Sequence, residues 1–272
     1  MNQMTAKVSC FARAYHTEHS AEPVFSDPAA KPLLGADYEQ IAQSMTQGVG
    51  FFLPGFDGSP EEGLRRIVEE QLAPSVLARS AFCEAALEQE AREGCSQYLL
   101  LASGYDTWAI RHPGSSFTVF ELDLPEMIED KRTRIAAAGL SSEAIYVPCD
   151  LSDPSWADTL RAHGFWDDRP AFCSLLGISY YLSTEEFRTL LKTLGGLLCE
   201  RSCLCFDYPL KGDSRQAETN RALASGAGEA MKARYSEPEL EALLSNNGFS
   251  IREHRTDDLR GVGYVLAALH AA

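Results

Sequence analysis

Short apolar runs alternate with helix-like segments from residue 97 onward, and this alternation constrains the fold more than any other feature. The runs with strand character lie at 97–102, 117–123, 144–150, 171–181, 203–210, 249–254 and 263–270. Segments with apolar residues at helical spacing separate most of them, and Gly139, Gly164 and Gly248 stand where these helices should stop. Strands that alternate with helices favour an α/β fold with a doubly wound, mainly parallel sheet.

The last two runs are joined by "RTDDLRGV", which has no helical pattern. A parallel crossover needs about a dozen residues or more, usually including a helix. We therefore predict a terminal hairpin and a seven-stranded, Rossmann-like sheet whose last strand is antiparallel. This pattern differs from the six parallel strands typical of a dinucleotide-binding dehydrogenase.

The first part of the chain is predicted to be helical and rich in loops. We expect residues 1–95 to form a helical lid segment, with a helix break at Pro74. Residues 96–272 are expected to form the core that carries the sheet, with an insertion at about 211–235. Ser183 and Ser236 each precede an acid at the spacing of a capping box, which predicts two helix starts.

Charge and composition exclude several classes of partner. The 272 residues carry 39 acids against 24 bases, a formal net charge of -15, which disfavours binding to nucleic acid or to anionic membranes. No apolar run approaches the ~20 residues that span a bilayer, and no signal core is visible, so we expect a cytoplasmic protein. The eight cysteines include no CxxC pair, which favours buried thiols over a disulfide or metal framework.

Acids follow three consecutive predicted strands, at the edge where open α/β sheets bind ligands. Asp106 lies in the loop after the first strand, Asp123 ends the second and Asp150 ends the third. Asp123 stands 19 residues after Gly104, a spacing suited to binding ribose hydroxyls. Asp150 could accept the exocyclic amine of adenine, with a backbone amide from Leu151. The pattern predicts an adenosine-containing ligand.

The glycine content of the first loop narrows the choice of ligand. The absence of GxGxxG argues against the pyrophosphate cradle of NAD or FAD, and no GxxxxGK[ST] motif is present. The remaining common adenosine cofactor is S-adenosylmethionine.

Several segments, in this order, resemble motifs of the leucine carboxyl methyltransferase family, in particular its bacterial carboxyl O-methyltransferases of polyketide pathways. They are "LAPSVLARSAFCEAAL", "QYLLLASGYDTWAIR", "FELDLPEMIEDKRTRI", "VPCDLSDPSWADTLRAHGFWDDRPAF" and "GISYYLSTEEF". The family's counterparts to the second, third and fifth read "QVVLLGAGLDTRAYR", "EVDLP…K" and "EGLLMYL". The resemblance covers nearly the whole chain.

The resemblance implies S-adenosyl-L-methionine as the methyl donor and assigns roles to individual residues. Arg79 would pair with the methionine carboxylate, and Gly104 would approach the methionine portion. Asp123 would bind the ribose hydroxyls, and Asp150 with Leu151 would bind adenine. The remaining cofactor-binding positions that we predict are Ala102, Ser103, Asp106, Leu124 and Leu176. Ala102 replaces the family's first glycine and Leu176 its glutamate, which places cofactor orientation or turnover in question.

The resemblance implies a carboxylate as the methyl acceptor, which we expect to belong to a small molecule. A carboxylate is already ionised at neutral pH and needs no base. The residues predicted to contact it are Arg13, Tyr180, Tyr181 and Tyr208. Bases in the insertion, such as Lys211, Arg215 and Lys232, could also hold an anion. A phenol acceptor would want a base, for which His16, His19 and His112 are the nearest by segment.

Other interpretations stay open at this point. The chain could methylate the terminal carboxylate of a protein, or it could be a non-catalytic relative that binds S-adenosylmethionine without turnover. An NAD-dependent dehydrogenase is disfavoured by the glycine count and the terminal hairpin. No metal site is predicted, and a homodimer is left open.

Overall fold

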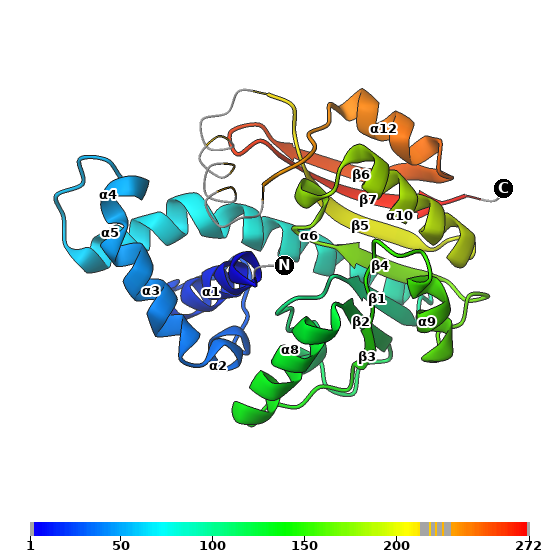
Figure 1. Ribbon diagram of the computed structural model, residues 1–272, viewed down its shortest axis with the longest axis horizontal. Coiled ribbons are helices and arrows are strands. Elements are labelled where there is room, and N and C mark those ends of the chain that lie inside the picture. The colour runs from blue at the N-terminus through cyan, green and yellow to red at the C-terminus, as the bar shows by residue number, and fades with distance from the viewer. Residues whose placement is uncertain (1–2, 213–217, 219–220, 222–224, 226–229, 271–272) are drawn as a thin grey trace.

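A seven-stranded sheet runs through the centre of the structure, a computed structural model that describes residues 3–212, 218, 221, 225 and 230–270 (Figure 1). The strands lie in the order β3-β2-β1-β4-β5-β7-β6. Their bounds are β1 Gln97–Leu101, β2 Thr118–Asp123, β3 Ile145–Pro148, β4 Ala171–Leu175, β5 Cys203–Pro209, β6 Phe249–Asp257 and β7 Val262–Leu269. The first five strands pair in parallel, and β7 is antiparallel to both β5 and β6. The predicted α/β sheet with an antiparallel last strand is confirmed.

Helices precede the sheet and connect its strands. Their bounds are α1 Met4–His19, α2 Ala30–Leu34, α3 Asp37–Gln47, α4 Val49–Phe52, α5 Pro60–Arg66, the π-helical segment η1 Ile67–Leu72, α6 Ala73–Arg92, α7 Trp108–Arg111, α8 Pro125–Ala137, α9 Trp156–Ala162, the 3₁₀ turn η2 Ser179–Tyr181, α10 Thr184–Leu197 and α12 Glu237–Ser245. The expected break at Pro74 appears as a change from π-helical to α-helical geometry at Ala73, because proline fits the first turn of α6. Both predicted capping boxes are present, at Ser183 and Ser236.

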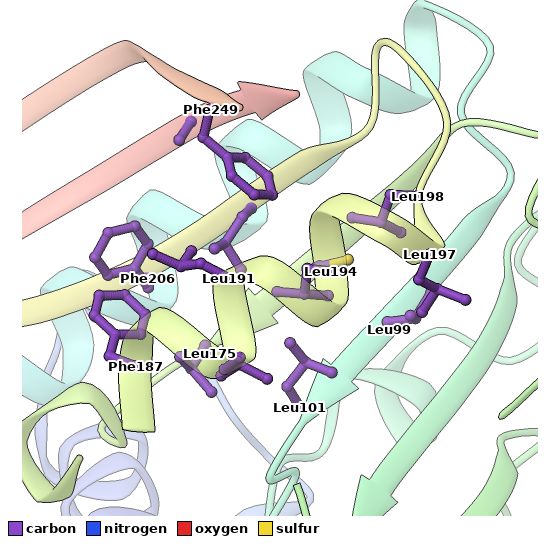
Figure 2. Packing of buried hydrophobic residues seen from close by; sticks show 14 of the residues in the cluster. Leu99, Leu101, Leu175, Phe187, Leu191, Leu194, Leu197, Leu198, Phe206 and Phe249 are labelled. Atoms are coloured by element: carbon purple, nitrogen blue, oxygen red, sulfur yellow. The ribbon is translucent and has the colours of Figure 1, made fainter. Parts of the chain in front are cut away.

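Two apolar layers cover the two faces of the sheet. On one face α9, α10 and α12 pack against alternate strand residues, with Leu191 and Leu194 of α10 close to Leu101 and Phe206 (Figure 2). On the other face α6 packs through Phe82 and neighbouring residues. Helix α6 falls within the predicted lid segment 1–95, and it packs on the sheet.

The remaining helices form a third apolar cluster beside the sheet. Residues of α1, α2, α3, η1 and the start of α6 pack together there with Met127 and Ile135 of α8. Helices α1 to α5 accordingly lie together at the left of Figure 1. This placement brings α1 close to the carboxyl ends of the central strands. None of the helices in the described part of the chain has the length and apolar character needed to cross a membrane.

The fourth predicted strand is shorter than expected. The apolar run 171–181 suggested a single strand, but β4 ends at Leu175 and the chain turns at Gly177, which has a φ of 72°. Backbone with positive φ suits glycine and breaks the strand. The chain then forms the short turn η2, which carries the two tyrosines predicted to contact the acceptor.

Candidate functional site

A cavity of about 410 Å³ lies beyond the carboxyl ends of β1, β2 and β4, where α1, η1 and α6 cover the sheet. Most of the residues predicted for cofactor or acceptor line this cavity. They are Arg13, Arg79, Ala102, Ser103, Gly104, Asp106, Asp123, Leu176, Tyr180 and Tyr181. The structure therefore brings together residues that lie far apart in the sequence, at the edge of the sheet where parallel strands present ligand sites.

The loop after β1 has the backbone geometry of a glycine loop although it begins with alanine. Ala102 has a φ of 53° and Gly104 a φ of 48°, so both residues lie in the left-handed region. An alanine pays a steric penalty there that glycine does not. Ala102 therefore adopts a backbone conformation that favours glycine.

Asp123, at the end of β2, is bonded to this loop. One carboxylate oxygen accepts the backbone N–H of Gly104 at 2.7 Å, and the other accepts that of Leu124 at 2.8 Å. Burial raises the pKa of Asp123, against the opposing effect of these two amides. Each carboxylate oxygen has a second lone pair, so Asp123 can still accept hydroxyl groups from a ligand in the cavity.

Arg79 projects from α6 toward the turn after β4. Its Nη1 donates to Oδ2 of Asp207 at 3.3 Å and its Nη2 to Oγ of Ser9 at 3.2 Å. The guanidinium also lies against Gly177, where an added Cβ would come within 2.7 Å of Nη1. A guanidinium has five N–H donors and these bonds use two of them, so Arg79 can also pair with an anion in the cavity.

Asp207, on β5, is fully buried and gathers several donors. Its Oδ1 accepts the backbone N–H of Gly177 at 2.6 Å, and its Oδ2 accepts the hydroxyl of Tyr180 at 3.0 Å as well as Arg79. Burial, reinforced by the nearby carboxylate, raises the pKa of Tyr180, which keeps its hydroxyl a donor. Sequence analysis gave this residue no role. The available signal was an acid inside the apolar run "CLCFDYPL", because a buried acid requires partners.

Arg13 lines the cavity but is held firmly by its neighbours. Its Nε donates to Asp27 at 2.8 Å and its Nη2 to the carbonyl of Tyr105 at 2.7 Å. Asp27 is 1% exposed and also lies 3.6 Å from Arg111, which pairs with Glu84. Arg13 therefore ties α1 to the loop after β1.

Four predicted residues lie outside the residues that line the cavity: Leu124, Asp150, Leu151 and Tyr208. Asp150 is exposed and accepts the backbone N–H of Ser152 at 2.8 Å, while Leu151 packs against the apolar core. Tyr208 was expected to line the acceptor pocket, but it is fully buried on the opposite face of β5 and bonds to His254 at 2.9 Å. Side chains alternate along a strand, so Asp207 faces the cavity side and Tyr208 faces the core.

The basic segment after β5 is described only in part. Lys211 pairs with Glu239, and Lys232 pairs with Glu186 at 2.9 Å, so these two bases are engaged at the surface. Arg215 lies outside the described residues. Met231 of this segment does line the cavity.

The N-terminal helices, which fall in the predicted lid segment, contribute several residues to the wall of the cavity that were not predicted individually. Besides Arg13 and Arg79, these helices supply apolar side chains, which are Met4, Ala6, Val8, Met45, Phe52, Leu72 and Val76, and polar ones, which are Thr5, Ser9, Gln71, Ser75 and Ser80. No histidine is among the described lining residues, and no group of three potential metal ligands occurs in the described part of the chain. His16, His19 and His112 therefore lie outside the cavity wall.

The chain is similar to known proteins over most of its length. The family model of leucine carboxyl methyltransferase matches residues 6–195. A putative S-adenosyl-L-methionine-dependent methyltransferase of Bacillus subtilis (strain 168), YktD, is 34% identical over 94% of this chain and 89% of that protein. A putative S-adenosyl-L-methionine-dependent methyltransferase of Mycobacterium avium (strain 104) is 29% identical over 92% of this chain and 80% of that protein.

Solved structures share the fold at low sequence identity. A putative methyltransferase from Thermobifida fusca matches with a TM-score of 0.59 at 19% identity, over 84% of this chain and 95% of that one. Magnesium protoporphyrin IX methyltransferase from Synechocystis, solved with bound S-adenosylhomocysteine, matches with a TM-score of 0.51 at 13% identity, over 86% of this chain and 96% of that one. These likenesses show the methyltransferase fold.

Proposed function

The chain belongs to the leucine carboxyl methyltransferase family, and we propose that it is an S-adenosyl-L-methionine-dependent O-methyltransferase that acts on a carboxylate of a small molecule. The observation that carries this proposal is the set of chemically distinct groups around one cavity. A guanidinium enters it from α6, a carboxylate from the end of β2, and apolar side chains from the N-terminal helices.

The residues present fit the proposed cofactor. Arg79 has donors left for the methionine carboxylate, and Asp123 has acceptors left for the ribose hydroxyls. Ala102 and Gly104 line the same cavity, and the N–H of Gly104 is bonded to Asp123. Asp150 and Leu151 follow β3, the strand next to β2, and we propose that they approach the adenine from outside the cavity wall. When bound, S-adenosylmethionine supplies an electrophilic methyl group on a sulfonium.

The lining of the cavity favours an acceptor that is already ionised. A phenol, with a pKa near ~10, would need a base, whereas a carboxylate has a pKa near ~4. No described histidine lines the cavity. Of the two acids that line it, Asp106 accepts the N–H of Trp108 at 2.7 Å, and we propose that the ribose takes the acceptors that Asp123 has left beside its two amide bonds.

The chain's part in the reaction is then to bind, orient and exclude water. The negative charge of the carboxylate and the positive charge of the sulfonium both disappear as the methyl group is transferred. An apolar environment that excludes water therefore favours the reaction. Met4, Val8, Met45 and Phe52 supply such a surrounding. Alignment of the two reactants supplies the rest of the rate enhancement.

The first test is calorimetric titration of the purified protein with S-adenosylmethionine, S-adenosylhomocysteine and NAD. We expect micromolar binding of the first two and none of NAD. Binding of NAD alone would refute the cofactor assignment.

The second test is a methyl-transfer screen with apolar carboxylic acids and matched phenols. A carboxyl methyl ester releases methanol in mild alkali, whereas a phenol methyl ether does not, so the product identifies the acceptor group. Transfer to phenols alone would refute the carboxylate assignment. Binding of both cofactor forms without any transfer would favour the non-catalytic relative.

A further inference from the structure

The carboxylate of Asp207 occupies an unusual position, fully buried at the foot of the cavity wall. Its two oxygens face two different parts of the wall. Oδ1 accepts the N–H of Gly177 at 2.6 Å, and Oδ2 accepts Nη1 of Arg79 at 3.3 Å and the hydroxyl of Tyr180 at 3.0 Å. A single rigid carboxylate therefore fixes the guanidinium of α6 relative to the turn after β4.

We propose that Asp207 is a positioning residue that acts through Arg79, holding its guanidinium where it recognises the carboxylate of the methionine portion of the cofactor. This inference rests on the proposed function, because it assumes that Arg79 binds that carboxylate. Asp207 itself is fully buried and is not among the residues that line the cavity.

The packing around the guanidinium explains why such a residue is needed. An arginine side chain has many rotamers, and fixing its planar fork beforehand lowers the entropy lost when it binds a carboxylate. At Gly177 the backbone approaches so closely that an added Cβ would lie 2.7 Å from Nη1, 2.8 Å from Nη2 and 2.9 Å from Cζ of Arg79. The bond from Gly177 to Asp207 sets this backbone, and the bond from Arg79 to Asp207 sets the fork beside it.

The negative charge of Asp207 also attracts the positive charge of Arg79. Arg79 is 15% exposed at its side chain and Asp207 is 1% exposed, so their attraction is weakly screened by water. The bond to Ser9 of α1 gives the guanidinium a second fixed point. The N–H groups of Arg79 that make neither of these bonds are the ones available to a ligand.

The variant Asp207→Asn separates the two bonds. Asparagine has the same shape, and its amide oxygen can still accept the N–H of Gly177. Its NH₂ group would then face the hydroxyl of Tyr180 and the guanidinium, so the bond to Arg79 is lost while the turn is kept. The two probes are S-adenosylhomocysteine and 5′-methylthioadenosine, which lacks the amino-acid group.

We expect Asp207→Asn to lower the affinity for S-adenosylhomocysteine by about 10-fold or more, which is the effect of losing one charge-assisted hydrogen bond. The affinity for 5′-methylthioadenosine should fall by less than about twofold. A merely structural defect would weaken both probes alike, and that result, or unchanged affinity for both, would overturn the proposal. Ser179→Ala is the matched control. It removes a buried bond of 2.5 Å to the backbone carbonyl of Asp207, and we expect the ratio of the two affinities to stay unchanged.

A double-mutant cycle with Arg79→Met distinguishes failure of this inference from failure of the proposed function. In the Arg79→Met background Asp207→Asn should have no further effect on the ratio, because the two residues act together. If Arg79→Met leaves the ratio unchanged, the proposed role of Arg79 is wrong and both statements fall. If Arg79→Met changes the ratio and Asp207→Asn does not, only the inference falls.

A second variant covers the case in which Asp207→Asn does not fold. Gly177→Ala keeps the acid in the sequence but adds a Cβ within 2.7 Å of the guanidinium, which must move away, and it also strains a backbone whose φ is 72°. We expect the same selective loss of S-adenosylhomocysteine binding, and an unchanged ratio in this variant would overturn the proposal.

Discussion

Replacing Lys131 with methionine is expected to destabilise the protein in a strongly pH-dependent way. Nζ of Lys131, on α8, donates to Oε2 of Glu121, on β2, at 2.5 Å, and both side chains are completely buried. Burial raises the pKa of Glu121, and the charge of Lys131 opposes that rise. Without its partner, the carboxylate would remain buried and unpaired, so the folded protein would bind a proton to neutralise it.

The magnitude follows from the cost of that proton. Glu121 has an ordinary pKa near ~4.3 in the unfolded chain but must be neutral in the folded variant. Keeping it protonated costs about 1.36 kcal/mol of folding free energy for each pH unit above that pKa. The expected loss is therefore about 4 kcal/mol at pH 7 and about 1 kcal/mol at pH 5. Because the folded variant holds one more proton than the unfolded chain, its stability falls as pH rises. Removal of one partner from a buried ion pair typically costs about 3–5 kcal/mol, which agrees.

Urea unfolding of wild type and Lys131→Met between pH 5 and pH 7.5 measures this difference. Adding Glu121→Leu to the variant removes the titrating group and should restore most of the stability with a flat profile. A difference between wild type and Lys131→Met that does not change with pH would refute the reasoning.

Three further changes have defined outcomes. Asp123→Asn should weaken the binding of S-adenosylhomocysteine, measured by calorimetry, by about 1–3 kcal/mol, because one acceptor for the ribose is lost. An unchanged affinity would contradict the ribose assignment. Ala102→Gly should raise the free energy of unfolding by up to about 1.5 kcal/mol, because relief of a left-handed alanine (about 1–2 kcal/mol) outweighs the added flexibility of the unfolded chain (about 0.5–1 kcal/mol). A lower free energy of unfolding for this variant, measured by urea denaturation, would contradict the left-handed conformation of Ala102, whose φ is 53°. Leu191→Ala, at a fully buried position, should cost about 2–5 kcal/mol in urea unfolding with no change in cofactor affinity.

The sheet could be predicted well from the sequence because its signals are local. Each apolar run is bounded by turn residues, and the short link between the last two runs forces a hairpin. Strand β4 is the exception: the run 171–181 is mainly apolar, but β4 ends at Leu175 and the chain turns at Gly177. Apolar character alone does not reveal such a turn.

The site could be predicted where a residue follows a strand, as Asp123 does, because topology places strand ends together. Contacts across the fold were harder to predict. The bonds of Asp207 depend on a guanidinium 128 residues earlier in the chain, and no spacing rule connects the two. Tyr208 was misplaced for a related reason, since the face of a buried strand cannot be read when both faces are apolar.

The order of the strands has a consequence for synthesis of the protein. β7 follows β6 in the chain but lies between β5 and β6 in the sheet. Until residues 262–269 have left the ribosome, β6 has no neighbour to join and β5 ends the sheet as an open edge of apolar residues. Such edges pair readily with other chains. A nascent or truncated chain that lacks β7 would therefore depend on chaperones to remain unaggregated, although its first five strands could already pair.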